Sequence, residues 1–238
     1  MLRRTPPFSL TGSRDNFARR VWFSKLDISP ILYAETLVAT DALLQTARNA
    51  GAPVLAFLLK STARALHAVP QLNYYTFDGR PVWAGETARI SASIELDDGR
   101  VELTTFTSPE TKRIAALTAE IVAEGERLQR EADLPPTLSM RLMNRFPRLH
   151  FLLARWLGRH ETGYMKGMGP IYVAAVNAPG VYRSFNQPFA SPTLIFNRAL
   201  EGRAVLGLSF NHGLGNVRQI GPFLDAIRQS LETPDALL

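Results

Sequence analysis

The chain has 238 residues, a formal net charge of +6 and 46% hydrophobic residues, enough to bury the core of one large domain or two small ones. It contains no cysteine, which excludes disulfide frameworks, cysteine nucleophiles and thiolate metal sites. Its four histidines do not fall at metal-ligand spacing, and no apolar run reaches the roughly 18 residues of a membrane span. We therefore expect a cytoplasmic protein without a metal site.

Positive charge is concentrated in two arginine clusters, one in the first 20 residues and one between 141 and 159. No helix-turn-helix, zinc-finger or RNA-recognition pattern accompanies either cluster. Despite the basic composition, a nucleic-acid partner is therefore not expected.

The first predicted elements are a strand and two helices. Residues 33–51 alternate between apolar and polar side chains and then take up helical spacing, with Thr40 or Asp41 as N-cap and Gly51 as the stop. This pattern predicts a strand that leads into a helix. A second, buried helix is predicted over 53–69.

The middle of the chain predicts a sheet and a covering helix. Apolar residues alternate with polar ones over 90–96, and the sequence DDGR at 97–100 is typical of a hairpin turn. This sheet is expected to have one solvated face. An amphipathic helix capped by Ser108 is predicted over 108–132 and is expected to cover the sheet.

The segment 137–160 combines an apolar side with an arginine-rich side, and Pro147 is expected to break or kink it. Three interpretations are open. The segment is either a docking helix whose arginines face water, or a helix that contacts an anionic membrane surface, or a lid that lines a substrate pocket.

The last third predicts strands followed by a terminal helix. Strand patterns cover 171–177, 193–200 and 204–210, separated by proline and glycine turns. The final helix carries five apolar residues on one face: Ile220, Phe223, Leu224, Ile227 and Leu231.

The stretch 208–216, LSFNHGLGN, is an apolar strand that ends on a histidine. Gly213 and Gly215 leave space beside the His212 ring, which is unusual for plain packing. His212 is therefore the candidate functional residue, and the other three histidines are expected to be structural.

The sequence around this histidine resembles the catalytic domain of dihydrolipoyl acyltransferases of 2-oxo acid dehydrogenase complexes, and chloramphenicol acetyltransferase. In that superfamily a strand runs into Asp-His-x-x-x-Asp-Gly and a helix follows. Residues 17–26 are similar to the family's opening double-arginine segment, and 53–80 to its long helix and Pro-x-Leu-Asn turn. The positions that match the histidine motif are Asn211, His212, Asn216 and Val217.

The resemblance covers residues 17–238 and implies an α+β, two-layer fold, in which a mixed sheet is covered by helices and three chains form a homotrimer. Residues 1–16 are then a loose N-terminal segment. The basic helices form an insertion at about 130–168, longer than the family pattern.

The resemblance also implies the chemistry. His212 acts as general base and removes the proton from a thiol or hydroxyl that attacks a thioester. Coenzyme A or a pantetheine thioester, including an acyl carrier, is the implied co-substrate, and no cofactor is bound permanently. The neighbouring subunit completes the channel to the histidine. The family's aspartate pairs with an arginine, which implies that Asn216 is paired with Arg19 or Arg20.

Three departures from the family pattern bear on function. Val217 replaces the glycine of the motif, which implies a repacked turn. Asn216 replaces the aspartate, so a charge-assisted pair becomes a weaker neutral hydrogen bond. Ala174 stands where the family has the serine or threonine that stabilises the oxyanion. Asn211 and Asn216 flank His212 and are expected to hold a water molecule or the ring. The candidate replacements for the missing hydroxyl are Tyr172, Asn177 and Ser184.

The sequence thus favours transfer of an acyl group from a thioester to a small acceptor. Two alternatives stay open because of the replaced residues. One is a non-catalytic trimer that keeps the fold for assembly or ligand binding. The other is an enzyme that uses the same pocket for proton transfer, cyclisation or hydrolysis.

Overall fold

The computed structural model describes residues 31–77, 80–97, 99–134, 145–146, 169–176, 184, 192–197, 200–212 and 216–238. The predicted N-terminal segment 1–16 lies outside these residues, and so does almost all of the basic segment 137–160. No helix in the described part of the chain is long and apolar enough to cross a membrane.

A mixed six-stranded sheet forms the centre of the fold, in the order β1-β8-β7-β6-β4-β5. Strand β6 is parallel to both of its neighbours, and the other neighbouring strands are antiparallel. A separate hairpin pairs β2 with β3. The strands are β1 Ile31–Ala39, β2 Tyr74–Phe77, β3 Arg80–Trp83, β4 Arg89–Glu95, β5 Val101–Thr107, β6 Ile171–Ala175, β7 Thr193–Phe196 and β8 Arg203–Asn211.

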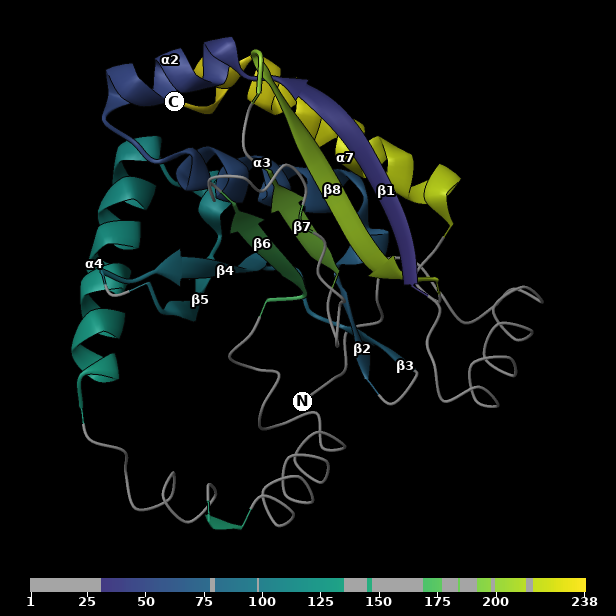
Figure 1. Cartoon of the computed structure of the whole chain (residues 1–238). Helices are drawn as coiled ribbons and strands as arrows, with labels where there is room; N and C mark the ends of the chain where they lie inside the picture. Colours follow the sequence, from purple (N-terminus) through teal and green to yellow (C-terminus); the bar gives the residue numbers. More distant parts are fainter. Residues whose placement is uncertain are drawn as a thin grey trace.

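Helices form the second layer of the fold. In Figure 1 α3 and α7 lie together behind the sheet, and their buried side chains share one hydrophobic core with β8, β7 and β6. We call the opposite side of the sheet the outer face. The predicted α+β, two-layer fold is therefore confirmed. The helices are α2 Asp41–Ala50, α3 Val54–Ala68, α4 Ile114–Ala132 and α7 Val217–Glu232, with short 3-10 turns η1 Pro70–Leu72, η2 Pro109–Thr111 and η5 Pro234–Leu237.

Local sequence signals set several of these boundaries as predicted. Helix α2 starts after Thr40 and ends at Gly51, whose φ of 58° is the left-handed conformation that glycine adopts without strain. The five apolar residues predicted for one face of α7 are all buried. The spacing of the apolar residues was enough to identify this face, because α7 packs against the core along one side only.

The predicted start of the helix after β5 is wrong. Ser108 has φ 50° and opens η2, and α4 begins only at Ile114 without a side-chain cap. The physical reason is Pro109, which disfavours the helical conformation in the residue before it. The amide of Ser108 instead donates to the carbonyl of Ala88 at 2.8 Å, which ties the turn to the sheet.

Helix α4 lies against the β4–β5 hairpin, as predicted. The Thr104 hydroxyl donates to Glu124 Oε2 at 2.6 Å, and the Asp97 amide donates to Gln129 Oε1 at 3.3 Å. The hydrogen bond from Arg127 is the largest of the causes that hold the pKa of Glu124 below its ordinary value, and the bond from Thr104 follows. The helix is therefore fixed by polar contacts at two points of the hairpin.

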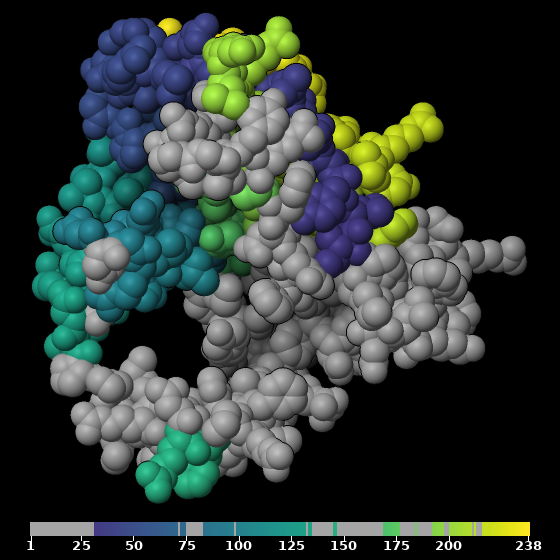
Figure 2. Space-filling model, viewed as in Figure 1, coloured from purple at the N-terminus to yellow at the C-terminus, as the bar shows by residue number. Residues whose placement is uncertain are grey.

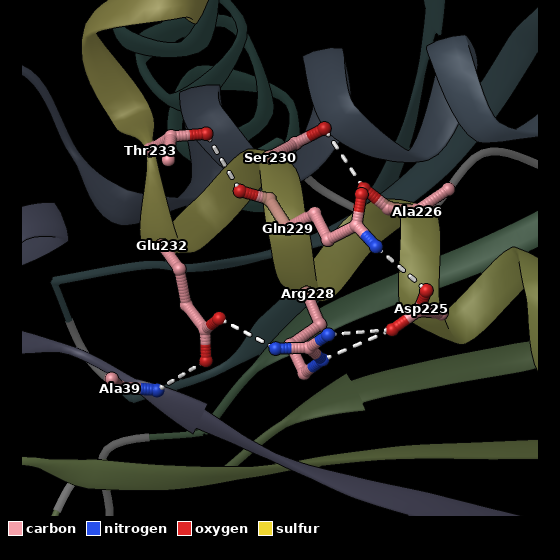
Figure 3. Close-up of polar contacts among 8 residues, drawn as sticks. All are labelled: Ala39, Asp225, Ala226, Arg228, Gln229, Ser230, Glu232 and Thr233. Atoms are coloured by element: carbon pink, nitrogen blue, oxygen red, sulfur yellow. Dashed lines mark hydrogen bonds and ion pairs between the residues drawn. The ribbon is translucent and has the colours of Figure 1, made fainter.

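Helix α7 also secures the end of the edge strand β1. The Ala39 amide donates to Glu232 Oε1 at 3.0 Å, and Arg228 Nη1 donates to the other oxygen of the same carboxylate at 2.6 Å (Figure 3). Arg228 is itself held by Asp225, with Nη2 2.6 Å from Oδ1. An outward amide of the edge strand is thus satisfied by a carboxylate that is already oriented.

Candidate functional site

Strand β8 carries His212 to one end of the sheet. The strand pairs with β1 over nine residues, ending with Asn211 opposite Ile31, and His212 follows directly. Leu208 and Phe210 are fully buried against the helices, which anchors the strand just before the histidine. His212 as a whole is partly exposed although its Nδ1 is buried, so the residue is held by the fold and still reaches solvent.

Asn216 begins helix α7. Its Oδ1 accepts a hydrogen bond from the Gln219 amide at 3.0 Å, and the Gln219 side chain accepts one from the Asn216 amide at 3.0 Å. These two reciprocal bonds form a capping box. Asn216 therefore fixes the start of α7 four residues after His212. The predicted partners Arg19 and Arg20 lie outside the described residues.

A row of hydroxyl side chains crosses the outer face close to this end of the sheet. Six paired positions, one on each strand, all carry a hydroxyl group, and we call them the hydroxyl row. Ser209 is three residues before His212, which is about 10 Å along an extended strand. The row consists of Tyr33, Ser209, Thr193, Tyr172, Ser91 and Thr105.

Some of these hydroxyl groups bond within the sheet. Ser91 Oγ lies 3.0 Å from Thr105 Oγ1 and accepts a bond from the Gly169 amide at 2.7 Å. Ser91 is 2% exposed, which corrects the expectation that the polar side chains of β4 face solvent. A Cβ at Gly169 would lie 2.3 Å from the Arg89 carbonyl oxygen, so this close approach requires glycine.

The predicted replacements for the oxyanion hydroxyl lie in different places. Tyr172 is part of the hydroxyl row and is partly exposed. The amide and the hydroxyl of Ser184 donate to Asn197 Oδ1 at 2.7 and 3.0 Å. Asn197 bonds Val205, seven residues before His212 and about 23 Å away along β8. Within one subunit Ser184 therefore lies at the opposite end of the sheet.

On the outer face, Ala174 lies two residues beyond the hydroxyl row along the strand direction, on the side away from His212. It pairs with Ile195, which pairs with Gly207. Gly207 is five residues before His212, about 17 Å along the strand. Ala174 is therefore not adjacent to His212 within one subunit. Asn177 lies outside the described residues, and of Asn211 only the backbone is described.

Ser209 and Thr193 are the site residues that sequence reasoning missed. Each sits in a strand that was predicted, but the strands that bring them together are distant in sequence. Period-two alternation could have placed Ser209 on the face opposite Leu208. Only the pairing register shows that it continues a row of hydroxyl groups.

No metal site is evident in the described ranges, where no group of three or more histidines and carboxylates could hold an ion. Within the described residues, this end of the sheet holds a histidine that follows β8, a capped helix start four residues later and, about 10 Å back along the strand, a row of hydroxyl groups. Such a set offers a base and hydrogen-bond donors.

Comparison with known proteins identifies the fold through solved structures and not through sequence. No protein-family model matches the sequence, and no curated protein matches it significantly. A chloramphenicol acetyltransferase superposes with a TM-score of 0.57 at 18% identity, covering 94% of this chain and 98% of that one. A truncated catalytic core of the 2-oxoacid dehydrogenase multienzyme complex from Thermoplasma acidophilum gives 0.62 at 19% identity, covering 96% and 98%.

A third solved structure is the dihydrolipoamide acetyltransferase of Azotobacter vinelandii, with a TM-score of 0.62 at 16% identity and coverage of 100% of this chain and 94% of that one. Its catalytic mechanism was investigated at a serine, a histidine and an asparagine, the last lying four residues after the histidine. The chain thus has the chloramphenicol acetyltransferase-like fold that the sequence predicted, shared with catalytic domains of dihydrolipoamide acetyltransferases.

Proposed function

We propose that this protein is an acyltransferase that moves an acyl group from a coenzyme A or carrier-protein thioester to a small acceptor, with His212 as general base. The observation that carries the proposal is the place of His212, held at the end of β8 yet partly exposed, in a fold shared with acyltransferases. Asn216 follows it at the histidine–asparagine spacing studied in the Azotobacter enzyme. The asparagine at position 216 therefore does not by itself argue against the proposal.

The reaction uses the imidazole twice. Neutral His212 takes the proton from the acceptor hydroxyl or thiol as the acceptor atom bonds to the thioester carbonyl carbon. The tetrahedral intermediate then collapses, the carbon–sulfur bond breaks, and the imidazolium returns the proton to the departing thiolate. No other reactant is needed, so atoms and charge balance.

The oxyanion of that intermediate needs a hydrogen-bond donor, and Tyr172 is the proposed one. Of the predicted replacements, it is the one that the described structure places in the hydroxyl row, whereas the Ser184 hydroxyl is bonded to Asn197. The protein is proposed to act as a homotrimer in which a neighbouring subunit forms the second wall of the channel. Sedimentation or light scattering of the purified chain would reveal a monomer if this assembly is wrong.

The test measures release of free thiol from acyl-coenzyme A thioesters of several chain lengths, with and without hydroxyl, amine and thiol acceptors. His212→Ala is expected to abolish release. The control His67→Ala is expected to keep it, because His67 lies on α3 and contacts Glu110 of η2 instead. Tyr172→Phe is expected to lower the rate by on the order of a hundredfold.

Each other outcome contradicts the proposal in a distinct way. Equal rates in wild type and His212→Ala remove His212 as the base. Thiol release that does not depend on any acceptor points to hydrolysis. Binding of the thioester without turnover, unchanged by His212→Ala, points to the non-catalytic trimer, which the alanine at position 174 favours.

A further inference from the structure

Ser91 ties the segment that enters β6 to strand β4. Its Oγ accepts a hydrogen bond from the Gly169 amide at 2.7 Å, across 78 residues of sequence, and both residues are buried. The same oxygen lies 3.0 Å from Thr105 Oγ1 on β5. Because two partners on different segments engage this one hydroxyl, its orientation is fixed.

The approach of the two backbones is as close as sterics allow. A Cβ at Gly169 would lie 2.3 Å from the Arg89 carbonyl oxygen and 2.7 Å from the Ser91 amide nitrogen. The glycine therefore lies directly on the backbone of β4, and the Ser91 hydroxyl receives its amide at that point. Contact and hydrogen bond together define where the chain enters β6.

The link from this contact to Tyr172 is short and stiff. Gly169 precedes a proline, which favours an extended backbone, and Pro170 has a fixed φ and no amide hydrogen to donate. Ile171 follows and is fully buried. Tyr172 comes next and pairs with Ser91 itself in the register of β4 and β6. A shift of Gly169 is therefore passed on to Tyr172.

Strand β6 has few other contacts that could hold Tyr172 in place. The strand has five residues, and only three of its positions pair with β4. On the other side, the Tyr172 amide donates to the Pro192 carbonyl at 2.9 Å, just before β7. Part of β6 (green) is visible at the molecular surface beside the β4–β5 hairpin (Figure 2), in keeping with the partial exposure of Tyr172.

We propose that Ser91 is a positioning residue for acyl transfer. By holding the Gly169 amide it fixes the start of β6, and with it the Tyr172 hydroxyl that stabilises the oxyanion. The inference rests on the proposed function, which assigns this donor role to Tyr172. Ser91 is 2% exposed and acts through Tyr172 instead of touching the substrate.

The kinetic test is a double-mutant cycle on kcat for thiol release. Ser91→Ala is expected to lower kcat roughly ten- to a hundredfold, the range expected when a donor is displaced by about 1 Å. KM should not change, because the oxyanion exists only beyond the ground state. In a Tyr172→Phe background Ser91→Ala should have no further effect, because the hydroxyl that it positions is already absent.

Two serine variants serve as matched controls, and both are expected to keep the wild-type kcat. Ser93 lies two residues along β4 on the same face, and its hydroxyl makes no hydrogen bond within the described structure. Ser61 is as buried as Ser91, and its Oγ donates to the Leu58 carbonyl at 3.1 Å, but it lies on α3. Ser61→Ala therefore shows what the loss of any buried hydroxyl does.

The position of Tyr172 can be measured without turnover. The full chain carries 3-fluorotyrosine at position 172, and its fluorine resonance is recorded by NMR. Ser91→Ala is expected to shift or broaden this resonance, whereas Ser93→Ala leaves it unchanged. Ser91→Cys keeps the size of the side chain but accepts hydrogen bonds weakly, so it replaces Ser91→Ala if the alanine variant does not fold.

The outcomes separate this inference from the proposed function. An equal loss of kcat from Ser91→Ala in wild type and in Tyr172→Phe overturns the inference, because Ser91 then acts on the fold in general. An unchanged fluorine resonance in the folded Ser91 variant overturns it even if His212 is catalytic. A wild-type kcat in Tyr172→Phe instead refutes the oxyanion donor of the proposed function, and the inference falls for that separate reason. Without turnover in any variant, the resonance alone decides whether Ser91 positions Tyr172.

Discussion

Replacing Asn216 by alanine tests the capped helix start beside the candidate base. The substitution removes the bond between Asn216 Oδ1 and the Gln219 amide, which is 3.0 Å long. The reciprocal bond survives because it uses the backbone amide of residue 216. Loss of one such cap costs about 1 kcal/mol of unfolding free energy. For a chain of this size that corresponds to a Tm lower by about 2–4 °C, measured by circular dichroism.

Two variants serve as controls for this prediction. Asn216→Asp keeps a cap acceptor and adds a negative charge at the positive end of the helix dipole, so it is expected to match or exceed wild-type stability. Thr40 also precedes a helix, but its hydroxyl is buried without a hydrogen-bond partner. Thr40→Val should therefore cost nothing. An unchanged Tm for Asn216→Ala, or an equal loss for Thr40→Val, would refute the reasoning from side-chain caps.

The same variants address activity. Asn216 lies four residues after His212, and the start of α7 fixes where the chain enters its last helix. Asn216→Ala is expected to lower kcat for thiol release more than Thr40→Val does, while Asn216→Asp retains it. Comparable activity in all three would show that the helix start does not position the histidine.

Two further predictions concern contacts away from the site. Glu232→Ala is expected to speed hydrogen exchange at the Ala39 amide, because the amide loses its acceptor. Glu232→Gln keeps an acceptor oxygen and should keep the amide protected. Equally fast exchange in both variants would show that the charge of Glu232, and not the hydrogen bond, protects the amide. Glu124 has a folded pKa below its ordinary value near 4.5, chiefly because of its bonds with Arg127 and Thr104, so its stabilisation is present above that value and lost as pH falls through the folded pKa. The free energy of unfolding, measured at several pH values, should therefore be higher for wild type than for Glu124→Gln near pH 7. This difference in free energy should shrink as the pH falls. A difference that stays constant down to pH 2 would contradict it.

Much of the fold could be predicted because its signals are local. The spacing of Ile220, Phe223 and Leu224 identified the buried face of α7, and Gly51 marked the end of α2. The approach to His212 was recognised for the same reason, since a strand that ends in a histidine followed by small residues is visible in nine consecutive letters. The start of α4 differs from the prediction for a local reason as well, because Pro109 disfavours the helical conformation at Ser108.

By itself, then, the sequence indicated most of the helices and central strands and the histidine at the strand end, and its resemblance to the acyltransferases implied the two-layer architecture. Only the tertiary structure decided which side chains lie together on the outer face. Ser209, Thr193 and Tyr172 form one row, and Gly207 lies one step beyond, because of a register between strands far apart in the chain. Alternation assigns a residue to one of two faces, but a shift of one residue in pairing exchanges the faces. That register is fixed by packing of the whole sheet against α3 and α7, which no local pattern contains.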